Sequence, residues 1–250
     1  AACGASLTNA CSGPTTQMII GNNTGANTTT SWPAPYGNFY KNAKHQFLFT
    51  AAELNAMGFN GGKITEIAWE ITQINGTTTY NDYQIKMGCT ATNNLTAWEN
   101  GLTPVFGSPL TIQNINIPAP GWISHTFDVA YEWDGISNLV VEICYNNLAD
   151  PYTNNSITPW TTTAFTSSIW YRSDGTAACP TALNTSTGND RPITRFTHCP
   201  TIPDPTAFTY SWLPNTEITT ANIQNPYLHP EVPTTYEVTV SDLTGSCFDT

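Results

Sequence analysis

A chain of 250 residues exceeds the about 100–150 residues of a typical domain, so it can hold one large β domain or two domains. Only 10% of its residues are charged, and the formal net charge of -11 comes from scarce Lys and Arg rather than acidic runs, which argues against nucleic acid and anionic membranes as partners. Thr and Asn supply most of the polarity beside 8 Trp, 11 Tyr and 10 Phe, a composition that disfavours long helices and predicts an all-β protein.

The first 35 residues are rich in Gly, Asn, Thr and Pro and predict loops. The chain begins with Ala1 rather than Met, so we expect that a leader has been removed or that the chain is a fragment. One short apolar run, residues 17–20, predicts an edge strand. No stretch of the chain approaches the about 20 apolar residues of a membrane-spanning helix, so we expect no membrane insertion.

Residues 46–49 predict a strand, and the chain's one convincing helix pattern follows it. Thr50 is a typical N-cap, and Glu53 stands three residues later, as in a capping box. Leu54 and Met57 share a face, and Gly58 provides a helix stop. The pattern predicts a helix of two turns at most.

Two strands with alternating polarity come next. Residues 63–72 predict a strand whose inner face consists of Ile67, Trp69 and Ile71. After a reversal at Asn75-Gly76, residues 83–89 predict a strand whose inner face consists of Tyr83, Ile85 and Met87.

Residues 131–147 hold the most regular strand pattern of the chain. One face of this run is apolar and consists of Leu139, Val141, Ile143 and Tyr145. The opposite face is mixed and consists of Val140, Glu142 and Cys144. The pattern predicts a central strand of an antiparallel sandwich, with Asp134-Gly135 as the turn that leads into it.

Further strands are predicted at residues 105–106, 111–117, 122–129, 168–172 and 193–198. Strands that recur about every ten to fifteen residues, with turn residues between them, are typical of a sandwich or jelly roll. Residues 200–205 contain three prolines and predict a stiff linker. Beyond the linker, strands at residues 208–212 and 236–240 are too few for an independent sandwich of about 100 residues, so we expect a second domain that is cut short or borrows strands.

Seven cysteines follow no Cys-x-x-Cys spacing, which favours disulfides in an oxidising compartment over a zinc site. Proximity along the chain and position at strand ends suggest the pairs Cys3–Cys11, Cys89–Cys144 and Cys179–Cys199, one of 15 possible pairings. Cys247 is left over, so we expect its partner in chain that is not present here.

Two parts of the chain resemble known β modules. Residues 17–198 resemble the large β-sandwich modules of secreted surface proteins from the Bacteroidota, through segments 46–54, 62–69 and 134–142 and the pair Arg191-Pro192. Residues 206–248 resemble the PKD-like, immunoglobulin-like repeats of the same proteins, through segments 210–212, 222–226, 234–240 and 245–247.

The resemblance implies a jelly-roll-like antiparallel β-sandwich over residues 1–199 and, after the linker at 200–205, a partial Ig-like (PKD-like) β domain over 206–250. In such proteins, which include the long gliding-motility adhesins, the modules are exported by the type IX secretion system to the cell surface and act as stalk and adhesive units. The implied partners are surface glycans, other cell-surface proteins and neighbouring repeats of the same chain. Similar modules also accompany secreted hydrolases, so a carbohydrate-binding accessory module is the alternative.

Catalytic motifs are absent from the sequence, which has no nucleophile elbow, His-Glu-x-x-His motif, phosphate loop or dinucleotide loop. We therefore expect no enzyme activity. His45 and His125 could approach each other as metal ligands, or could be ordinary solvated or hydrogen-bonded strand histidines. Glu66 and Glu70 could be an acid and base pair, but they share one face of one strand, which favours an exposed polar face.

Two sets of candidate binding residues remain. A calcium ion, the one cofactor considered, could bind the turn residues Asp128, Glu132 and Asp134, which could equally be turn-formers beside a strand. Stacking on a sugar could involve the loop aromatics Trp98, Trp133, Tyr152 and Trp160. A second group of loop aromatics consists of Trp32, Tyr36, Phe39 and Tyr40. All of these rings could instead fill the ends of a long sandwich.

Overall fold

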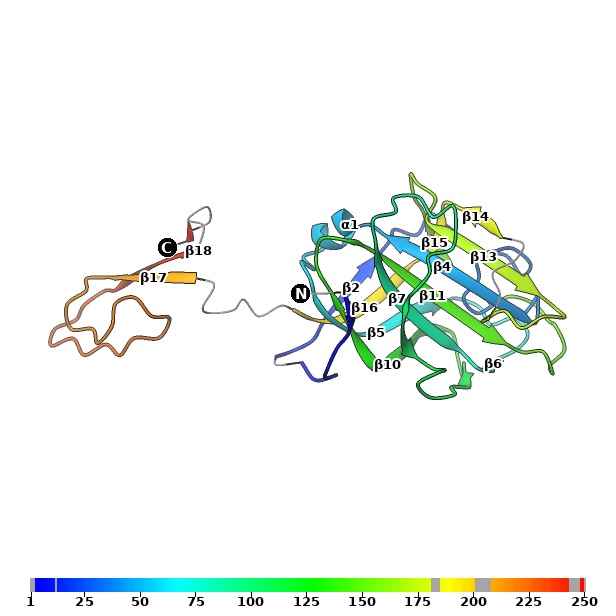
Figure 1. Ribbon diagram of the computed structural model, residues 1–250, viewed down its shortest axis with the longest axis horizontal. Helices are drawn as coiled ribbons and strands as arrows, with labels where there is room; N and C mark the ends of the chain where they lie inside the picture. Colours follow the sequence, from blue (N-terminus) through cyan, green and yellow to red (C-terminus); the bar gives the residue numbers. More distant parts are fainter. Residues whose placement is uncertain (1–2, 12, 181–184, 201–207, 243–247, 250) are drawn as a thin grey trace. The chain divides into compact units, whose positions relative to one another are not determined.

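A computed structural model describes residues 3–11, 13–180, 185–200, 208–242 and 248–249 of the chain. It divides the chain into two compact units, residues 1–201 and 202–250 (Figure 1). Pro200, the first residue of the predicted linker, is instead the last residue of a strand, while 201–205 lie outside the described residues. Apart from one short helix, the regular structure of the described residues consists of β-strands in antiparallel sheets.

A five-stranded antiparallel sheet, in the order β1-β10-β5-β16-β2, forms one layer of the first unit. Its strands are β1 (Gly4–Ala5), β10 (Gly121–Trp133), β5 (Gly62–Ile71), β16 (Thr194–Pro200) and β2 (Thr16–Ile20). The run at residues 17–20 therefore does form an edge strand, as the sequence predicts.

A six-stranded antiparallel sheet, in the order β14-β13-β4-β11-β7-β8, forms the opposing layer. Its strands are β14 (Ser186–Gly188), β13 (Ser168–Ser173), β4 (Asn42–Phe49), β11 (Asn138–Asn146), β7 (Gln84–Thr90) and β8 (Thr103–Phe106). In Figure 1, β4, β11 and β7 run side by side. The prediction that β11 is a central strand is confirmed.

Three small sheets complete the regular structure. In the first unit they are β15-β12-β3 and β6-β9, formed by β15 (Asp190–Pro192), β12 (Pro159–Thr162), β3 (Gly25–Ala26), β6 (Thr79–Tyr80) and β9 (Ile115–Asn116). In the second unit the sheet is β17-β18-β19, formed by β17 (Phe208–Leu213), β18 (Glu237–Asp242) and β19 (Phe248–Asp249).

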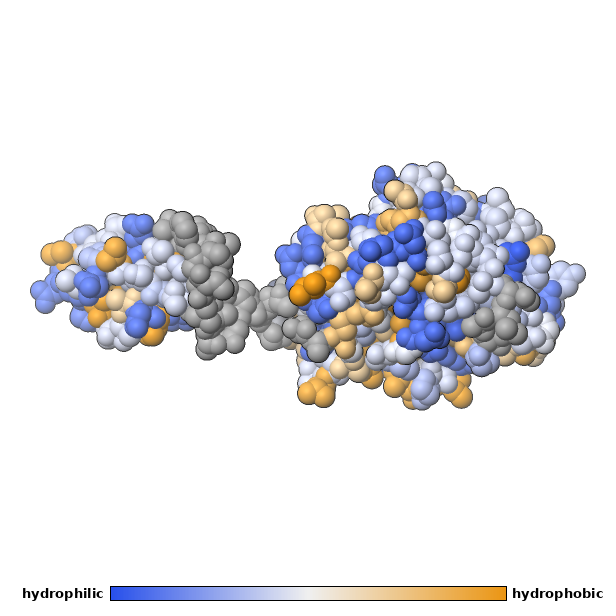
Figure 2. All heavy atoms as spheres, turned by 45° about the horizontal axis from the view of Figure 1, so that its top comes forward, coloured by the Kyte–Doolittle hydropathy of each residue, from blue (hydrophilic) through white to orange (hydrophobic). Residues whose placement is uncertain are grey.

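The core lies between the two large sheets, because each presents an apolar face to the other. Phe47 on β4 contacts Trp69 on β5, with ring centroids 6.4 Å apart, and Phe49 contacts Phe196 at 5.1 Å. The residues predicted to face inward are all buried in this cluster, namely Ile67, Trp69, Ile71, Tyr83, Ile85, Met87, Leu139, Val141, Ile143 and Tyr145. Two facing antiparallel sheets around one core make this unit a β-sandwich. On the face shown in Figure 2, its apolar side chains lie in small groups among hydrophilic ones.

Helix α1 (Ala51–Ala56) is built as its sequence predicts. The Thr50 side chain accepts a hydrogen bond from the Glu53 amide, and the Glu53 carboxylate accepts one from the Thr50 amide, which completes the capping box. Leu54 anchors the helix in the core. The helix has 6 residues, and no helix in the described part of the chain is long and apolar enough to span a membrane.

The predicted strand at residues 111–117 is largely wrong. The structure forms only the two-residue β9 there. Ile112, whose apolar side chain supports the strand pattern, is 76% exposed and so has no core to face. Apolar and polar residues can therefore alternate in a short loop as they do in a strand, although no sheet face buries the apolar ones.

All six cysteines expected to form disulfides do so, but the predicted pairs are wrong. The bonds are Cys3–Cys89, Cys11–Cys199 and Cys144–Cys179. Strand register explains why the pair Cys89–Cys144 does not form: Cys89 lies opposite Leu139 and Cys144 lies opposite Gln84, so the two cysteines occupy opposite ends of the β7–β11 pair. Cys247 lies outside the described residues.

The second unit has a sheet but little interior. β17 and β18 pair from Phe208 opposite Asp242 to Leu213 opposite Glu237. Tyr210, Trp212, Val238 and Val240 share one face of the pair and are half-buried, and none of residues 209–241 is fully buried. Such a sheet has only a weak hydrophobic contribution to its stability.

Candidate functional site

The outer face of the six-stranded sheet carries an interstrand charge cluster. Glu142 on β11 lies directly between Gln46 on β4 and Lys86 on β7. Its carboxylate accepts hydrogen bonds from Lys86 Nζ at 3.0 Å and from Gln46 Nε2 at 2.8 Å. Lys44 Nζ lies 3.4 Å from the same carboxylate. Three adjacent strands thus place two ammonium groups around one acid.

A loop formed by residues 91–102 holds this cluster partly away from water. The side-chain amide of Gln46 donates to the Glu99 carbonyl and accepts from the Glu99 amide, both at 2.8 Å. The Trp98 ring lies 4.9 Å from Lys44 Nζ, and Leu95 is buried against Val140 and Leu48 of the sheet. As a result Lys44 is only 9% exposed and Glu142 only 4% exposed. The mixed face of β11 is a covered face, not a solvated one.

Beside the cluster lies a cleft of about 370 Å³, which we call the lysine cleft. It is lined by Lys44, Lys86, Glu99, Asn100, Gly101, Leu102, Pro104, Pro109 and Glu142. Its volume is at the lower end of the about 300–1,000 Å³ typical of small-ligand pockets. Ammonium donors, carboxylate acceptors and apolar walls meet there, so it can hold a small ligand that is polar on one side and apolar on the other.

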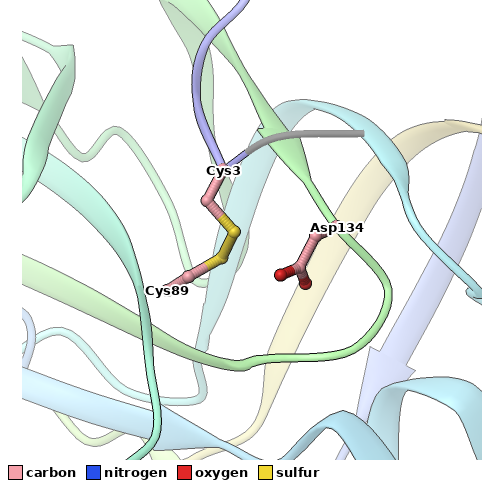
Figure 3. Close-up of side chains that lie close together, drawn as sticks. All are labelled: Cys3, Cys89 and Asp134. Atoms are coloured by element: carbon pink, nitrogen blue, oxygen red, sulfur yellow. A yellow bond between two sulfur atoms is a disulfide. The ribbon is translucent and has the colours of Figure 1, made fainter.

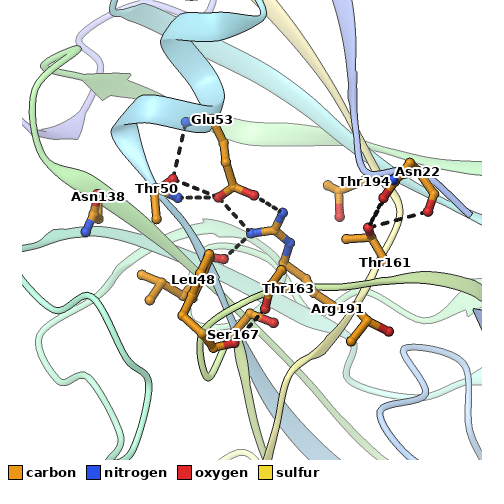
Figure 4. A network of polar contacts seen from close by, with 12 residues as sticks. Asn22, Leu48, Thr50, Glu53, Asn138, Thr161, Thr163, Ser167, Arg191 and Thr194 are labelled. Atoms are coloured by element: carbon orange, nitrogen blue, oxygen red, sulfur yellow. Dashed lines mark hydrogen bonds and ion pairs between the residues drawn. The ribbon is translucent and has the colours of Figure 1, made fainter. Parts of the chain in front are cut away.

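A larger hollow, of about 490 Å³, lies between the β2 edge and helix α1. It is lined by Ile19, Ile20, Gly21, Asn22, Glu53, Met57, Thr161, Thr162, Thr163, Ala164 and Phe165. Of its lining groups, Glu53 accepts a hydrogen bond at Oε1 from Arg191 Nη2 at 2.8 Å, and Arg191, which lies behind the lining, also donates to the Leu48 carbonyl (Figure 4). Thr161 likewise bonds Asn22. We therefore regard the lysine cleft as the better candidate for a polar ligand.

The Glu53 carboxylate of this network has a depressed pKa. Partial burial acts to raise the pKa, but the hydrogen bond and charge of Arg191 and the bonds from Thr50 outweigh it and leave the pKa of Glu53 below its ordinary value. Arg191 is completely buried and stacks its guanidinium 4.2 Å from the Phe49 ring centroid. The pair joins α1 to the sandwich, which is a structural role.

The predicted sugar-stacking set does not form one exposed platform. Trp133 is fully buried, where its ring packs 4.9 Å from Phe59 and its Nε1 donates to the Ser137 carbonyl, so its prediction as a stacking residue is wrong. It lies on the inward face of β10, in the core cluster of the sandwich. Trp98 and Trp160 are half-buried, and Tyr152 is 63% exposed. In the second aromatic group, Trp32 and Tyr36 are also buried.

The three carboxylates predicted to bind calcium have separate protein partners. Asp128 accepts from the Gly107 amide at 2.9 Å. Glu132 accepts from the Ser6 hydroxyl at 2.8 Å. Asp134 accepts from the amides of Ile136 and Ser137, at 2.9 and 2.8 Å, and from the Ser137 hydroxyl. The structure does not gather them as one ligand set among the described residues.

Asp134 is instead the turn-former of its segment. Slight burial would raise its pKa, but the hydrogen bonds from Ser137 and Ile136 lower the pKa below its usual value. Its carboxylate does lie near the sulfurs of Cys3 and Cys89 (Figure 3). Those sulfurs are joined in a disulfide and are not thiolate ligands, so this trio is no metal site.

The remaining candidates also have structural surroundings. His45 Nε2 accepts from the Ala34 amide at 3.3 Å, and His125 Nε2 lies 2.8 Å from the Tyr36 hydroxyl. No ring contact joins the two histidines in the part of the chain that is described. Glu66 accepts from Ser124 and Thr197 on neighbouring strands, while Glu70 is half-buried on the same strand.

The sequence contains a signal for the lysine cleft that pattern analysis missed. Lys44 and Gln46 alternate with the inward-facing Ala43, His45 and Phe47, so they had to share the outer face of one strand. What no local pattern could indicate is that β4 and β7 both lie next to β11.

No protein-family model matches the chain, and no curated protein matches it. Among solved structures, the chain is similar to the clostridial cysteine protease Cwp84 after propeptide cleavage, with 10% identity and a TM-score of 0.39 over 73% of this chain and 40% of that one. It is similar also to the cysteine protease and lectin-like domains of Cwp84, a surface layer associated protein of Clostridium difficile, with 12% identity and a TM-score of 0.36 over 64% of this chain and 32% of that one. At these scores the likeness supports no functional assignment.

Proposed function

We propose that this chain is a non-enzymatic segment of a secreted cell-surface adhesin or filament protein. The observation that carries the proposal is the set of three disulfides, which tie the N-terminal segment and the sheet strands together and suit an extracellular protein. In this proposal the first unit is a jelly-roll-like adhesive module, and the second is a PKD-like stalk repeat. The surface partners are glycans, other surface proteins or neighbouring repeats.

Two finer parts of the proposal rest on the sequence resemblance alone. They are export by the type IX secretion system and a role in gliding motility. The charge of -11 supports the choice of partners, since it disfavours binding to nucleic acid.

Antibody labelling of intact cells tests the proposal, together with attachment of beads coated with the purified chain to cells and glycan surfaces. We expect labelling without permeabilisation and attachment that heat-denatured chain does not give. Labelling only after permeabilisation would contradict the surface location. Turnover of a polysaccharide or peptide panel by the purified chain would contradict the non-enzymatic role.

A carbohydrate-binding accessory module of a secreted hydrolase is the second candidate. The lysine cleft favours it, because its mixed donors, acceptors and apolar walls suit a sugar. The full-length gene discriminates the two: tandem copies of these modules support the adhesin, and an adjoining catalytic domain supports the accessory module. Loss of glycan-array binding in a Trp98→Ala variant, whose ring lies beside Lys44, would also support the second candidate.

A further inference from the structure

Lys44 is a largely buried lysine whose ammonium group lines the cleft and has donors that no described protein group accepts. Its Nζ lies 3.4 Å from Glu142 and 4.9 Å from the Trp98 ring centroid, yet it makes no hydrogen bond in the part of the chain that the structure describes. An ammonium group has three donors, so the donors of Lys44 that no described protein group accepts remain available to a ligand in the cleft. Because Lys44 lines the cleft, an oxygen-bearing ligand there would supply the missing acceptors.

The second lysine is placed to bind the same ligand. Lys86 uses one donor on Glu142 Oε1 at 3.0 Å, and its side chain remains 24% exposed on the cleft wall. Both ammonium groups therefore flank one carboxylate and keep free donors. Two lysines on adjacent sides of one cleft suit a single carboxylate group of a ligand.

The other groups that line the cleft suit the part of the ligand that carries no carboxylate. Glu99 has one carboxylate oxygen engaged by Thr92 at 2.5 Å and a second without a hydrogen bond in the described residues. Asn100 adds an amide, while Leu102 and Pro104 add apolar walls. Carboxylate and amide acceptors suit hydroxyl donors, and an apolar wall suits the C–H face of a sugar ring.

Charge limits how acidic this ligand can be. Two lysines and two glutamates make the cleft formally neutral, and the chain as a whole has a net charge of -11. An acidic peptide with several carboxylates would therefore be repelled more strongly than a single carboxylate on a hydroxyl-rich ring. The volume of about 370 Å³ also suits a small ligand rather than a chain.

We infer that the lysine cleft binds a single acidic sugar residue, whose carboxylate accepts hydrogen bonds from Lys44 and Lys86 and whose hydroxyl groups donate to Glu99. The inference rests on the proposed function in that it treats the first unit as a binding module, and it names the ligand class.

Titration of the full chain with glucuronate, followed by NMR chemical-shift changes or calorimetry, tests the inference. Glucose is the matched ligand control, because it has the same ring with a hydroxymethyl group in place of the carboxylate, and acetate at equal ionic strength is the control for the sugar ring. We expect binding of glucuronate at least about tenfold tighter than of either control, the effect of losing a charge-assisted hydrogen bond.

Variants locate the site. Lys44→Met and Lys86→Gln should each weaken glucuronate binding by about tenfold or more, while Lys41→Met, outside the cleft, should leave it unchanged. Circular dichroism and melting curves check folding, and the more exposed Lys86 variant provides the test if Lys44→Met does not fold.

Three results would overturn the inference: equal binding of glucuronate and acetate, binding unaffected by the Lys86 change, and no binding of glucuronate at all. Tighter binding of a glutamate-rich peptide than of glucuronate would also overturn it. Bead attachment distinguishes this failure from that of the proposed function: attachment that persists without glucuronate binding contradicts only the ligand assignment, and loss of both contradicts both.

Discussion

His45 and His125 lie in the core, and burial lowers the pKa of each to about 3, with the nearby charge of Arg172 adding to the effect at His45. Both rings are therefore neutral in the folded protein. In the unfolded chain a histidine has its ordinary pKa of about 6.5. Between about pH 6.5 and 3 the unfolded state binds protons that the folded state does not, so stability falls as the pH drops through this window.

We expect the free energy of unfolding of the first unit to fall by about 1.4 kcal/mol per pH unit for each of these two histidines below about pH 6.5. Urea unfolding at about pH 7, 6 and 5 measures the slope, above the range in which most carboxylates titrate. Burial also lowers the pKa of His198, so a His125→Gln variant should reduce the slope by about 1.4 kcal/mol per pH unit without abolishing it. A variant with the slope of the parent protein would show that His125 is not buried in its neutral form.

Arg191 is a buried charged residue that is paired with Glu53, so its replacement should lower the stability of the first unit. Removing one partner of a buried ion pair costs about 3–5 kcal/mol. The Glu53 side chain is 31% exposed, so water can partly solvate its charge when Arg191 is removed. We therefore expect Arg191→Met to destabilise the first unit by about 3 kcal/mol, the lower end of this range. Denaturant unfolding at neutral pH measures this change, and Lys41→Met, expected within about 0.5 kcal/mol, is the control. A change below about 1 kcal/mol would show that the pair contributes little.

The Arg191–Glu53 ion pair makes the stability of the first unit depend on pH. The folded-state pKa of Glu53 is depressed, so its contribution is present above the unfolded value of about 4.3 and is lost as pH falls through the folded-state pKa. We expect Glu53→Gln to lower stability at neutral pH and to reduce the loss of stability below about pH 4. Unfolding curves at about pH 7 and 3 measure both effects. Equal losses in the parent protein and the variant over this interval would contradict the ion pair.

At the scale of the elements, the disulfides connect segments that are far apart in the sequence. Cys11–Cys199 joins the N-terminal segment to β16 across a sequence separation of 188, whereas Cys144–Cys179 spans 35. In the chain-entropy model a longer loop gives a larger stabilisation, about 5 and about 4 kcal/mol for these two. Cys3–Cys89 and Cys11–Cys199 both hold the N-terminal segment, in which the described residues before Cys11 form only the two-residue β1, so we attribute its fixed position largely to these two bonds.

Peptide mapping without reduction should recover the three bonds of the structure, including a peptide pair that links Cys11 to Cys199. Replacing both of these cysteines by serine should lower the free energy of unfolding by about 2–5 kcal/mol. Replacing Cys144 and Cys179 is the matched comparison and should cost somewhat less. Recovery of a peptide that links Cys89 to Cys144 would contradict the register of β7 and β11.

At the scale of the whole molecule, the two units differ in how much they bury. The first encloses a large aromatic and aliphatic cluster between two sheets, while in the second none of residues 209–241 is fully buried. Sheets with few buried contacts open locally at low free energy. The sandwich therefore supplies the stable part of the chain.

Hydrogen exchange should reveal this difference. We expect the amides of β4 and β11 to exchange at least about a hundredfold more slowly than those of β17 and β18, since core strands open only with the whole unit. Mass spectrometry of the labelled full chain measures both regions at once. Equal protection of β17 and β11 would show that the second unit is buried more fully than its side chains indicate.

Short-range patterns in the sequence determined the strand character of β5, β7 and β11, the capping box of α1 and the turn at Asp134-Gly135. These features depend on the alternation of side chains and on hydrogen bonds within a few residues, and the structure confirms them. The sequence also identified the six cysteines that form disulfides and the outward position of Glu142 on its strand.

Only the tertiary structure decided which strands are neighbours, and the functional candidates depend on that order. Because β11 lies between β4 and β7, Glu142 meets Lys44 and Lys86 in one cleft, although the three residues are far apart in sequence. The same order separates Cys89 from Cys144, and the inward face of β10 buries Trp133. Strand order depends on long-range packing of whole faces, which no local alternation specifies.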